Sequence, residues 1–197
     1  MDEAPVYEAV VTQVRVLPGV PFDVSSPMDD EDREVLEWLT PKRPNEDDFP
    51  LNLDVDRVFD KLFQGAVPPQ GDLLARLGFD VVVLCANEYQ PRADLHPGVE
   101  LIYMPTDDYD HIPPTNEHIE KVQATAALVV KRLLEGKAVL VTCQMGWNRS
   151  GLVTATALHL WHGWSGERCV VWLKQHREDA LYNKRFAIHI KSLRERT

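Results

Sequence analysis

The sequence has few cysteines and no long apolar run. Its three Cys residues are odd in number and far apart in a chain of 197 residues, so they do not suggest the paired framework of a small disulfide-stabilised domain. No apolar stretch reaches the roughly 18 residues that a membrane span requires. The first residues, Met1-Asp2-Glu3-Ala4-Pro5, are acidic and lead into no apolar segment of the signal-peptide kind. These absences predict a reduced, cytoplasmic protein.

Negative charge is concentrated in the first quarter of the chain. Residues 1–50 hold 13 Asp and Glu against four Lys and Arg, whereas the remainder holds 18 against 17. The net charge of −10 therefore belongs almost entirely to an acidic N-terminal extension, for which we expect a strand at 7–17 and a helix after Pro27. We expect this extension to pack on a main domain at 51–197; a lid or docking segment is the alternative. The acidic balance argues against nucleic acid or an anionic membrane as the partner.

Beyond residue 50, short apolar runs alternate with helical patterns. A strand is predicted at 80–85, where every residue after Asp80 is apolar, as is typical of a strand buried on both faces of a parallel sheet. A long helix is predicted from Thr115, its cap, to Leu134. Further elements are a strand or hairpin at 57–64, strands at 100–104 and 138–141, and helices at 69–77, 150–162, 165–176 and 183–194. This alternation predicts an α/β fold with a central, mostly parallel sheet of four to five strands flanked by helices.

One cysteine lies directly after a predicted strand. Cys143 follows the strand at 138–141, a short loop comes next, and Arg149 lies where a helix begins. Backbone N–H groups of such a loop and of the helix N-terminus form a nest for an anion, and the same positive field favours a thiolate. The residues that would hold a phosphoryl group are Gln144, Met145, Gly146, Trp147, Asn148 and Arg149. A thiolate beneath a bound phosphoryl group is a nucleophile for phosphorus; the alternative is a structural cysteine in an ordinary strand-to-helix turn.

The pattern Cys-x5-Arg-Ser resembles the signature loop of the cysteine-dependent protein tyrosine phosphatase superfamily. Gly146 and the run Asn148-Arg149-Ser150-Gly151 are most similar to its dual-specificity branch, of the bacterial or phage type. The resemblance implies a three-layer fold and hydrolysis of phosphotyrosine, phosphoserine or phosphothreonine in proteins through a phosphocysteine on Cys143. It also implies no cofactor, and a hydrogen bond from Ser150 to the sulfur that eases its departure in the second step.

A phosphatase of this kind needs an acid for the departing oxygen, and one loop offers three candidates. The loop at 105–114 follows the strand at 100–104, where the family carries its acid in a Pro-x-x-Asp pattern. Counting from Pro105 selects Asp108, with Asp107 as the second choice. The Asp-His-x-Pro-Pro pattern at 110–114 is instead similar to the phosphatase-and-tensin class and selects Asp110.

Two residues near the signature loop need separate interpretation. Cys85 ends a neighbouring predicted strand, and the resemblance to the phosphatase-and-tensin class implies that it can form a reversible disulfide with Cys143. A small buried apolar residue is the other interpretation of Cys85. Thr142 occupies the position where the family usually has His, which bears on the rate rather than on the class of reaction.

The substrate class remains open between several possibilities. A phosphorylated protein or peptide is the first choice, since residues 144–148 contain no cation of the kind that matches a phosphoinositide headgroup. The Gly-Trp-Asn-Arg core is similar to that of RNA 5′-triphosphatases, so the alternatives within the superfamily are an RNA 5′-triphosphatase or a phosphoinositide phosphatase. A catalytically silent phosphoprotein-binding module is an alternative of another class. No metal site is expected, since His159 and His162 on one predicted helix are interpreted as packing or surface residues.

Overall fold

The computed structural model describes residues 53–196. The strand and helix predicted within residues 1–50 lie outside the described residues. Within the described part, no helix is long and apolar enough to cross a membrane.

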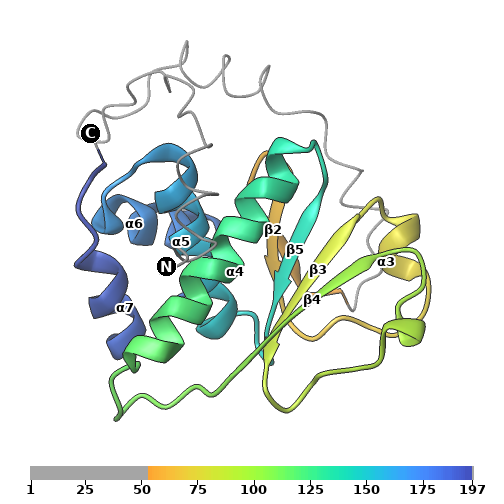
Figure 1. The fold of residues 1–197 in the computed structure, drawn as a ribbon, viewed down its shortest axis with the longest axis horizontal. Coiled ribbons are helices and arrows are strands. Elements are labelled where there is room, and N and C mark those ends of the chain that lie inside the picture. Colours follow the sequence, from red (N-terminus) through yellow and green to blue (C-terminus); the bar gives the residue numbers. More distant parts are fainter. Residues whose placement is uncertain (1–52, 197) are drawn as a thin grey trace, which may run out of the picture.

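A five-stranded sheet forms the centre of the domain (Figure 1). Its order is β1-β2-β5-β3-β4, and only β1 and β2 pair in antiparallel fashion. The predicted mostly parallel sheet is therefore confirmed, and the segment predicted at 57–64 is a hairpin. The strands are β1 (Val55–Phe59), β2 (Leu62–Gly65), β3 (Val81–Ala86), β4 (Glu100–Thr106) and β5 (Val139–Thr142).

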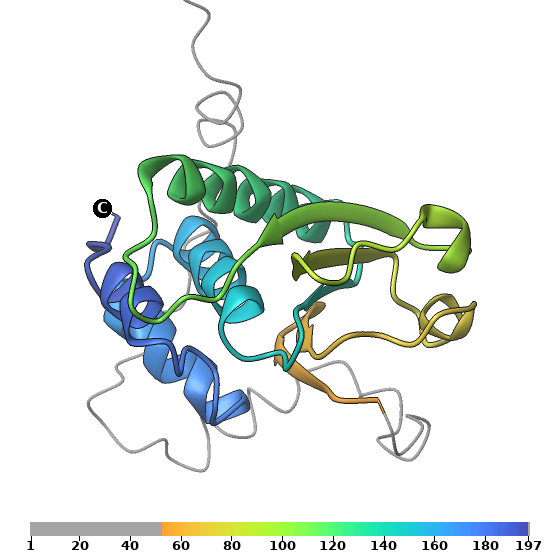
Figure 2. The same cartoon turned by 90° about the horizontal axis from the view of Figure 1, so that it is seen from below.

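The sheet separates two apolar cores. Along β3, Val81, Val83 and Cys85 belong to the larger core, whereas Val82 and Leu84 belong to the smaller one. Helices α4 to α7 lie on one side of the sheet, with α7 packed against α5 and α6, and the short α3 lies on the other side (Figures 1 and 2). Because successive side chains of a strand point to opposite faces, a strand buried on both faces must be apolar throughout, as predicted for β3.

Three of the described helices, α4, α6 and α7, begin after the residues where the sequence predicts their start. Thr115 accepts a hydrogen bond from the N–H of His118, and Ser165 and Asn183 cap the last two helices in the same way. Within residues 53–196 the helices are α3 (Leu73–Arg76), α4 (Asn116–Leu134), α5 (Arg149–His162), α6 (Gly166–His176) and α7 (Lys184–Lys191), and a 3₁₀ turn lies at Ala93–Leu95.

Several elements differ in length from their predictions, among them α3, α7 and β4. The first helix is shorter than 69–77 because Gly71 has a φ of +104°, outside the helical region, so α3 begins only at Leu73. The last helix ends at Lys191 rather than at 194, since the following backbone bonds to the α5–α6 turn through Gly163. Strand β4 continues to Thr106, so the first residues of the predicted acid loop still belong to the sheet.

Candidate active site

The signature loop, residues 143–150, joins β5 to α5 at the carboxyl end of the parallel strands. Cys143 is only 3% exposed, and its N–H donates to the carbonyl of Gly65 at 3.3 Å. Gly146 has a φ of +67°, and a Cβ at this position would collide with the carbonyl group of Gly65. The loop therefore packs against the end of β2 in a conformation that requires glycine at 146.

Two long side chains hold successive carbonyl groups of this loop. Arg177, between α6 and α7, donates from Nε to the Gly146 carbonyl (2.7 Å) and from Nη2 to the Met145 carbonyl (3.0 Å). Gln64 Nε2 also donates to the Gly146 carbonyl, at 2.8 Å. In a trans peptide the C=O and N–H point in opposite directions, so the N–H groups of Gly146 and Trp147 face away from these donors. This arrangement favours the nest of N–H groups that an anion requires.

Acidic residues at the start of the domain hold Arg177 in turn. Asp54 accepts two hydrogen bonds from its guanidinium at 2.8 Å, and Asp56 accepts one at 2.5 Å. Burial alone would lower the pKa of Arg177, but the hydrogen bonds and charges of these two carboxylates raise it overall. Sequence analysis missed Arg177, and no local pattern could have identified it, since its acidic partners lie more than 120 residues earlier in the chain.

The nucleophile candidate lies beside the predicted serine. Cys143 Sγ is 3.2 Å from Ser150 Oγ, and Ser150 is fully buried at the start of α5. Thr142 does not share in this contact, because its hydroxyl donates to the Val83 carbonyl on β3 at 2.9 Å. Thr142, at the position where the family usually has His, therefore links β5 to β3 by a side-chain hydrogen bond.

Arg149 is buried beside the thiol and bound by an acidic residue that the sequence analysis did not select. Glu88, in the loop after β3, accepts from Nη1 and Nη2 of Arg149 at 2.5 and 2.7 Å. The hydrogen bond with Arg149 lowers the pKa of the Glu88 carboxyl. Arg149 is 6% exposed, and its Nε has no partner within residues 53–196. Glu88 thus takes the end of the guanidinium and leaves its Nε–Nη2 edge for another anion.

Only one of the three candidate acids contacts the signature loop. Asp108 accepts from Asn148 Nδ2 at 2.9 Å and from Asn183 Nδ2 at 2.8 Å. Asp107 instead accepts from Asn87 at 3.2 Å, and Asp110 has a side chain that is 84% exposed. The structure therefore brings Asp108 to the site and leaves the other two outside it.

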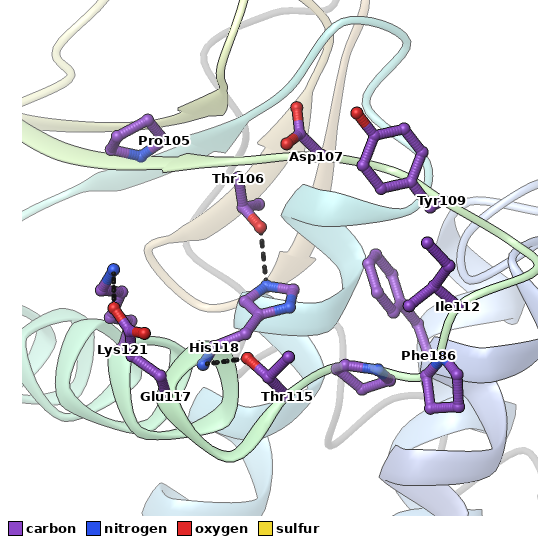
Figure 3. A pocket seen from close by; sticks show the side chains of 12 residues that line it. Pro105, Thr106, Asp107, Tyr109, Ile112, Thr115, Glu117, His118, Lys121 and Phe186 are labelled. Carbon is purple, nitrogen blue, oxygen red and sulfur yellow. Dashed lines mark hydrogen bonds and ion pairs between the residues drawn. The ribbon is translucent and has the colours of Figure 1, made fainter.

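A cavity of about 270 Å³ lies beside the acid loop (Figure 3). Asp107, Tyr109 and Ile112 line it from the loop, and His118 and Phe186 line it from α4 and α7. Neither Cys143 nor the arginine beside it borders this cavity, so it is separate from the anion site.

The second cysteine lies next to the first across the sheet. Leu84 on β3 pairs with Thr142 on β5 in parallel register, so Cys85 and Cys143 follow their paired residues on adjacent strands. Burial, followed by the charge of Cys143, raises the pKa of the Cys85 thiol well above its usual value. Both cysteines are reduced, and their neighbouring positions are compatible with the interpretation of Cys85 as a redox partner.

The two histidines of α5 take part in packing. His159 Nδ1 lies 2.7 Å from the carbonyl of Trp164, and the ring of His162 stacks between Trp161 and Trp164. Among residues 53–196, no group of His, Cys, Asp and Glu side chains is arranged to hold a metal ion.

Comparisons with known proteins identify the domain. The family model of the dual specificity phosphatase catalytic domain matches residues 62–196. A mouse putative dual specificity phosphatase, solved with zinc tungstate, is 26% identical with a TM-score of 0.61, over 73% of this chain and 86% of that chain. Tk-PTP in its active form is 25% identical with a TM-score of 0.62, over 73% of this chain and 98% of that one. Human DUSP28, at 24% identity and a TM-score of 0.58 over 73% and 93%, is similar in fold. No curated protein matches the chain in a sequence comparison.

Proposed function

Since the chain belongs to the dual specificity phosphatase family, we propose that it hydrolyses phosphorylated tyrosine, serine or threonine in proteins through a phosphocysteine on Cys143. One observation carries the proposal. The thiol and Ser150 are 3.2 Å apart in a loop whose arginine is buried with an unpartnered Nε. A buried cationic donor beside a buried thiol suits a bound phosphoryl group. We assign the catalytic unit to residues 51–197 and, because a thiolate nucleophile must stay reduced, its place of action to the cytoplasm.

In the first step, the Cys143 thiolate attacks phosphorus and the bond from phosphorus to the ester oxygen breaks. Asp108 gives its proton to the departing oxygen, which leaves as an alcohol or phenol. Loop N–H groups and the Nε–Nη2 edge of Arg149 bind the equatorial oxygens, where charge is spread in the transition state. Glu88 holds the opposite end of the same guanidinium, so Arg149 is oriented before substrate arrives.

In the second step, water attacks the phosphocysteine and the S–P bond breaks. Asp108, now a carboxylate, takes the proton from the attacking water. Ser150 donates a hydrogen bond to the departing Cys143 sulfur, for which its hydroxyl is at the right distance. Inorganic phosphate then leaves and the thiolate is restored.

Hydrolysis of p-nitrophenyl phosphate by the purified protein tests the enzymatic proposal. We expect turnover by wild type and none by Cys143→Ser, because a hydroxyl at this position is a far weaker nucleophile at neutral pH. Cys169→Ala is the matched control, since Cys169 is a buried cysteine of α6 outside the site. If wild type and Cys143→Ser are equally inert while both bind a phosphopeptide, the chain is a phosphoprotein-binding module instead.

A panel of phosphopeptides, phosphoinositides and triphosphate-ended RNA determines the substrate class. The side chains of Gln144 and Met145 are exposed at the site and carry no charge. A phosphopeptide, with one phosphoryl group and apolar neighbours, matches such a rim better than a highly charged headgroup does. Faster turnover of phosphoinositides or RNA than of every phosphopeptide would overturn this choice.

We also propose that Cys85 protects the nucleophile from irreversible oxidation. Neighbouring strands lie about 4.8 Å apart, which is within the range of backbone separations that a disulfide spans. Treatment with peroxide followed by non-reducing mass analysis should yield a Cys85–Cys143 link. Single oxidation of Cys143 to its sulfinic form in wild type would show that Cys85 is a packing residue only.

A further inference from the structure

Two asparagines from distant parts of the chain hold the carboxylate of Asp108. Asn148 belongs to the signature loop and donates to Oδ2, whereas Asn183 caps α7 and donates to Oδ1. Both oxygens of the carboxylate are therefore engaged. The acid loop, the signature loop and the beginning of α7 meet at this one group.

Backbone donors fix the orientation of both amides. The side-chain oxygen of Asn148 accepts the N–H of Asn183 at 2.7 Å. The side-chain oxygen of Asn183 accepts the N–H groups of Arg185 and Phe186, at 2.9 and 3.3 Å. Because each amide oxygen already serves a backbone N–H, only the NH₂ group of each is left for Asp108. Neither amide can turn over without losing a backbone hydrogen bond.

The same turn of α7 also supports the acid loop from its other side. Phe186 lines the cavity beneath the loop together with Tyr109 and Ile112 (Figure 3). Asn183 is 3% exposed and Phe186 is 2% exposed, so both are fixed by packing. The beginning of α7 thus meets the acid loop at two places, the hydrogen bond from Asn183 to Asp108 and the cavity that Phe186 lines with residues of the loop.

From these contacts we infer that Asn183 is a positioning residue for the general acid, a role that rests on the proposed function. Asn183 offers no group of its own to the phosphoryl group: its N–H binds the side chain of Asn148, and its NH₂ group sets where the Asp108 carboxyl lies. A displacement of about 1 Å in a reacting group can lower a rate by about 100-fold. The loss should depend on the leaving group, because only a weakly acidic alcohol or phenol needs a proton as it departs.

The test compares kcat/KM for two aryl esters in the full chain. Phenyl phosphate releases a phenol similar to that of tyrosine, with a pKa of about 10, whereas p-nitrophenyl phosphate releases a far more acidic one. Asn183→Ser keeps a side-chain oxygen that can cap α7 but has no NH₂ group for Asp108. We expect a loss of about 10- to 100-fold on phenyl phosphate and of less than about threefold on p-nitrophenyl phosphate.

Two controls separate positioning from general stability. Ser165→Ala removes the cap of α6, which has no contact with the acid loop, and should leave the ratio of the two rates unchanged. In an Asp108→Asn background, Asn183→Ser should have no further effect that depends on the leaving group. An active wild type whose Asn183→Ser variant slows both esters equally would overturn this role alone. A wild type inert on both esters would overturn the proposed function, and this role with it.

Discussion

The substitution Arg177→Met should destabilise the protein by an amount that can be worked out from the hydrogen bonds and ion pairs of Arg177. Methionine keeps a similar length but removes the donors of Arg177 to Asp54, Asp56 and the two loop carbonyls, of which only that of Gly146 keeps a side-chain donor, Gln64. The acidic partners are 56% and 43% exposed, so water replaces Arg177 there and each ion pair contributes no more than about 1 kcal/mol. The carbonyl groups accept from a charged donor, and their bonds contribute about 1.5 kcal/mol each at the lower end of the usual range. We therefore expect a loss of about 3–5 kcal/mol in the free energy of unfolding.

Urea unfolding measures the stability effect, and vanadate or tungstate binding measures the effect on the loop. We expect the variant to unfold at lower urea with an unchanged m-value, and to bind the oxyanion about tenfold more weakly because the N–H groups of the loop are no longer held in one direction. Arg177→Lys keeps the charge without the planar fork and should recover stability more than oxyanion affinity. A variant that matches wild type in both measurements would refute the reasoning that Arg177 shapes the loop.

Three further changes test other contacts. Glu88→Gln should lower kcat/KM by about tenfold, because Arg149 loses its charged partner and its fixed orientation; equal activity would exclude an orienting role for Glu88. Ser150→Ala should produce a larger burst of phenol release followed by slower steady turnover, since the sulfur of Cys143 departs less readily; slower formation of the phosphocysteine instead would contradict this assignment. Burial lowers the pKa of His162 to about 4, so the unfolded chain binds a proton between about pH 6.5 and 4 that the folded one does not. Stability should therefore fall as the pH falls through this range. The free energy of unfolding, measured with urea, should differ between pH 7 and pH 5 by about 2 kcal/mol less in His162→Phe than in wild type. An equal difference in the two proteins would contradict the burial argument.

The local sequence was sufficient to predict those features that depend on residues within one helix, strand or loop. The alternation of apolar runs with capped helical patterns predicted the sheet, and Thr115, Ser165 and Asn183 cap the helices that they were expected to begin. The predicted strand, loop and helix around Cys143 are also confirmed. These features depend on neighbours a few residues apart, through backbone conformation and side-chain caps.

Hydrogen-bond partners that are distant in the sequence could not be predicted in this way. Counting from Pro105 selected Asp108 over its neighbours, but only the approach of α7 to the acid loop shows which carboxylate contacts the signature loop. The catalytic role of Asp108 stays a prediction. Glu88 was missed because an acidic residue in a polar loop has no local signature of its partner.

The sequence by itself determined the chemistry that this protein can offer: a thiol, an arginine six residues later, and a loop between a strand and a helix that can bind an anion. The tertiary structure decided how those groups are held. Arg177 binds the loop carbonyls, Glu88 binds Arg149, and Asn183 binds Asp108, each across a separation of more than 30 residues. Such contacts depend on strand order and helix packing, which bring distant residues together, whereas local patterns specify only the elements that are packed.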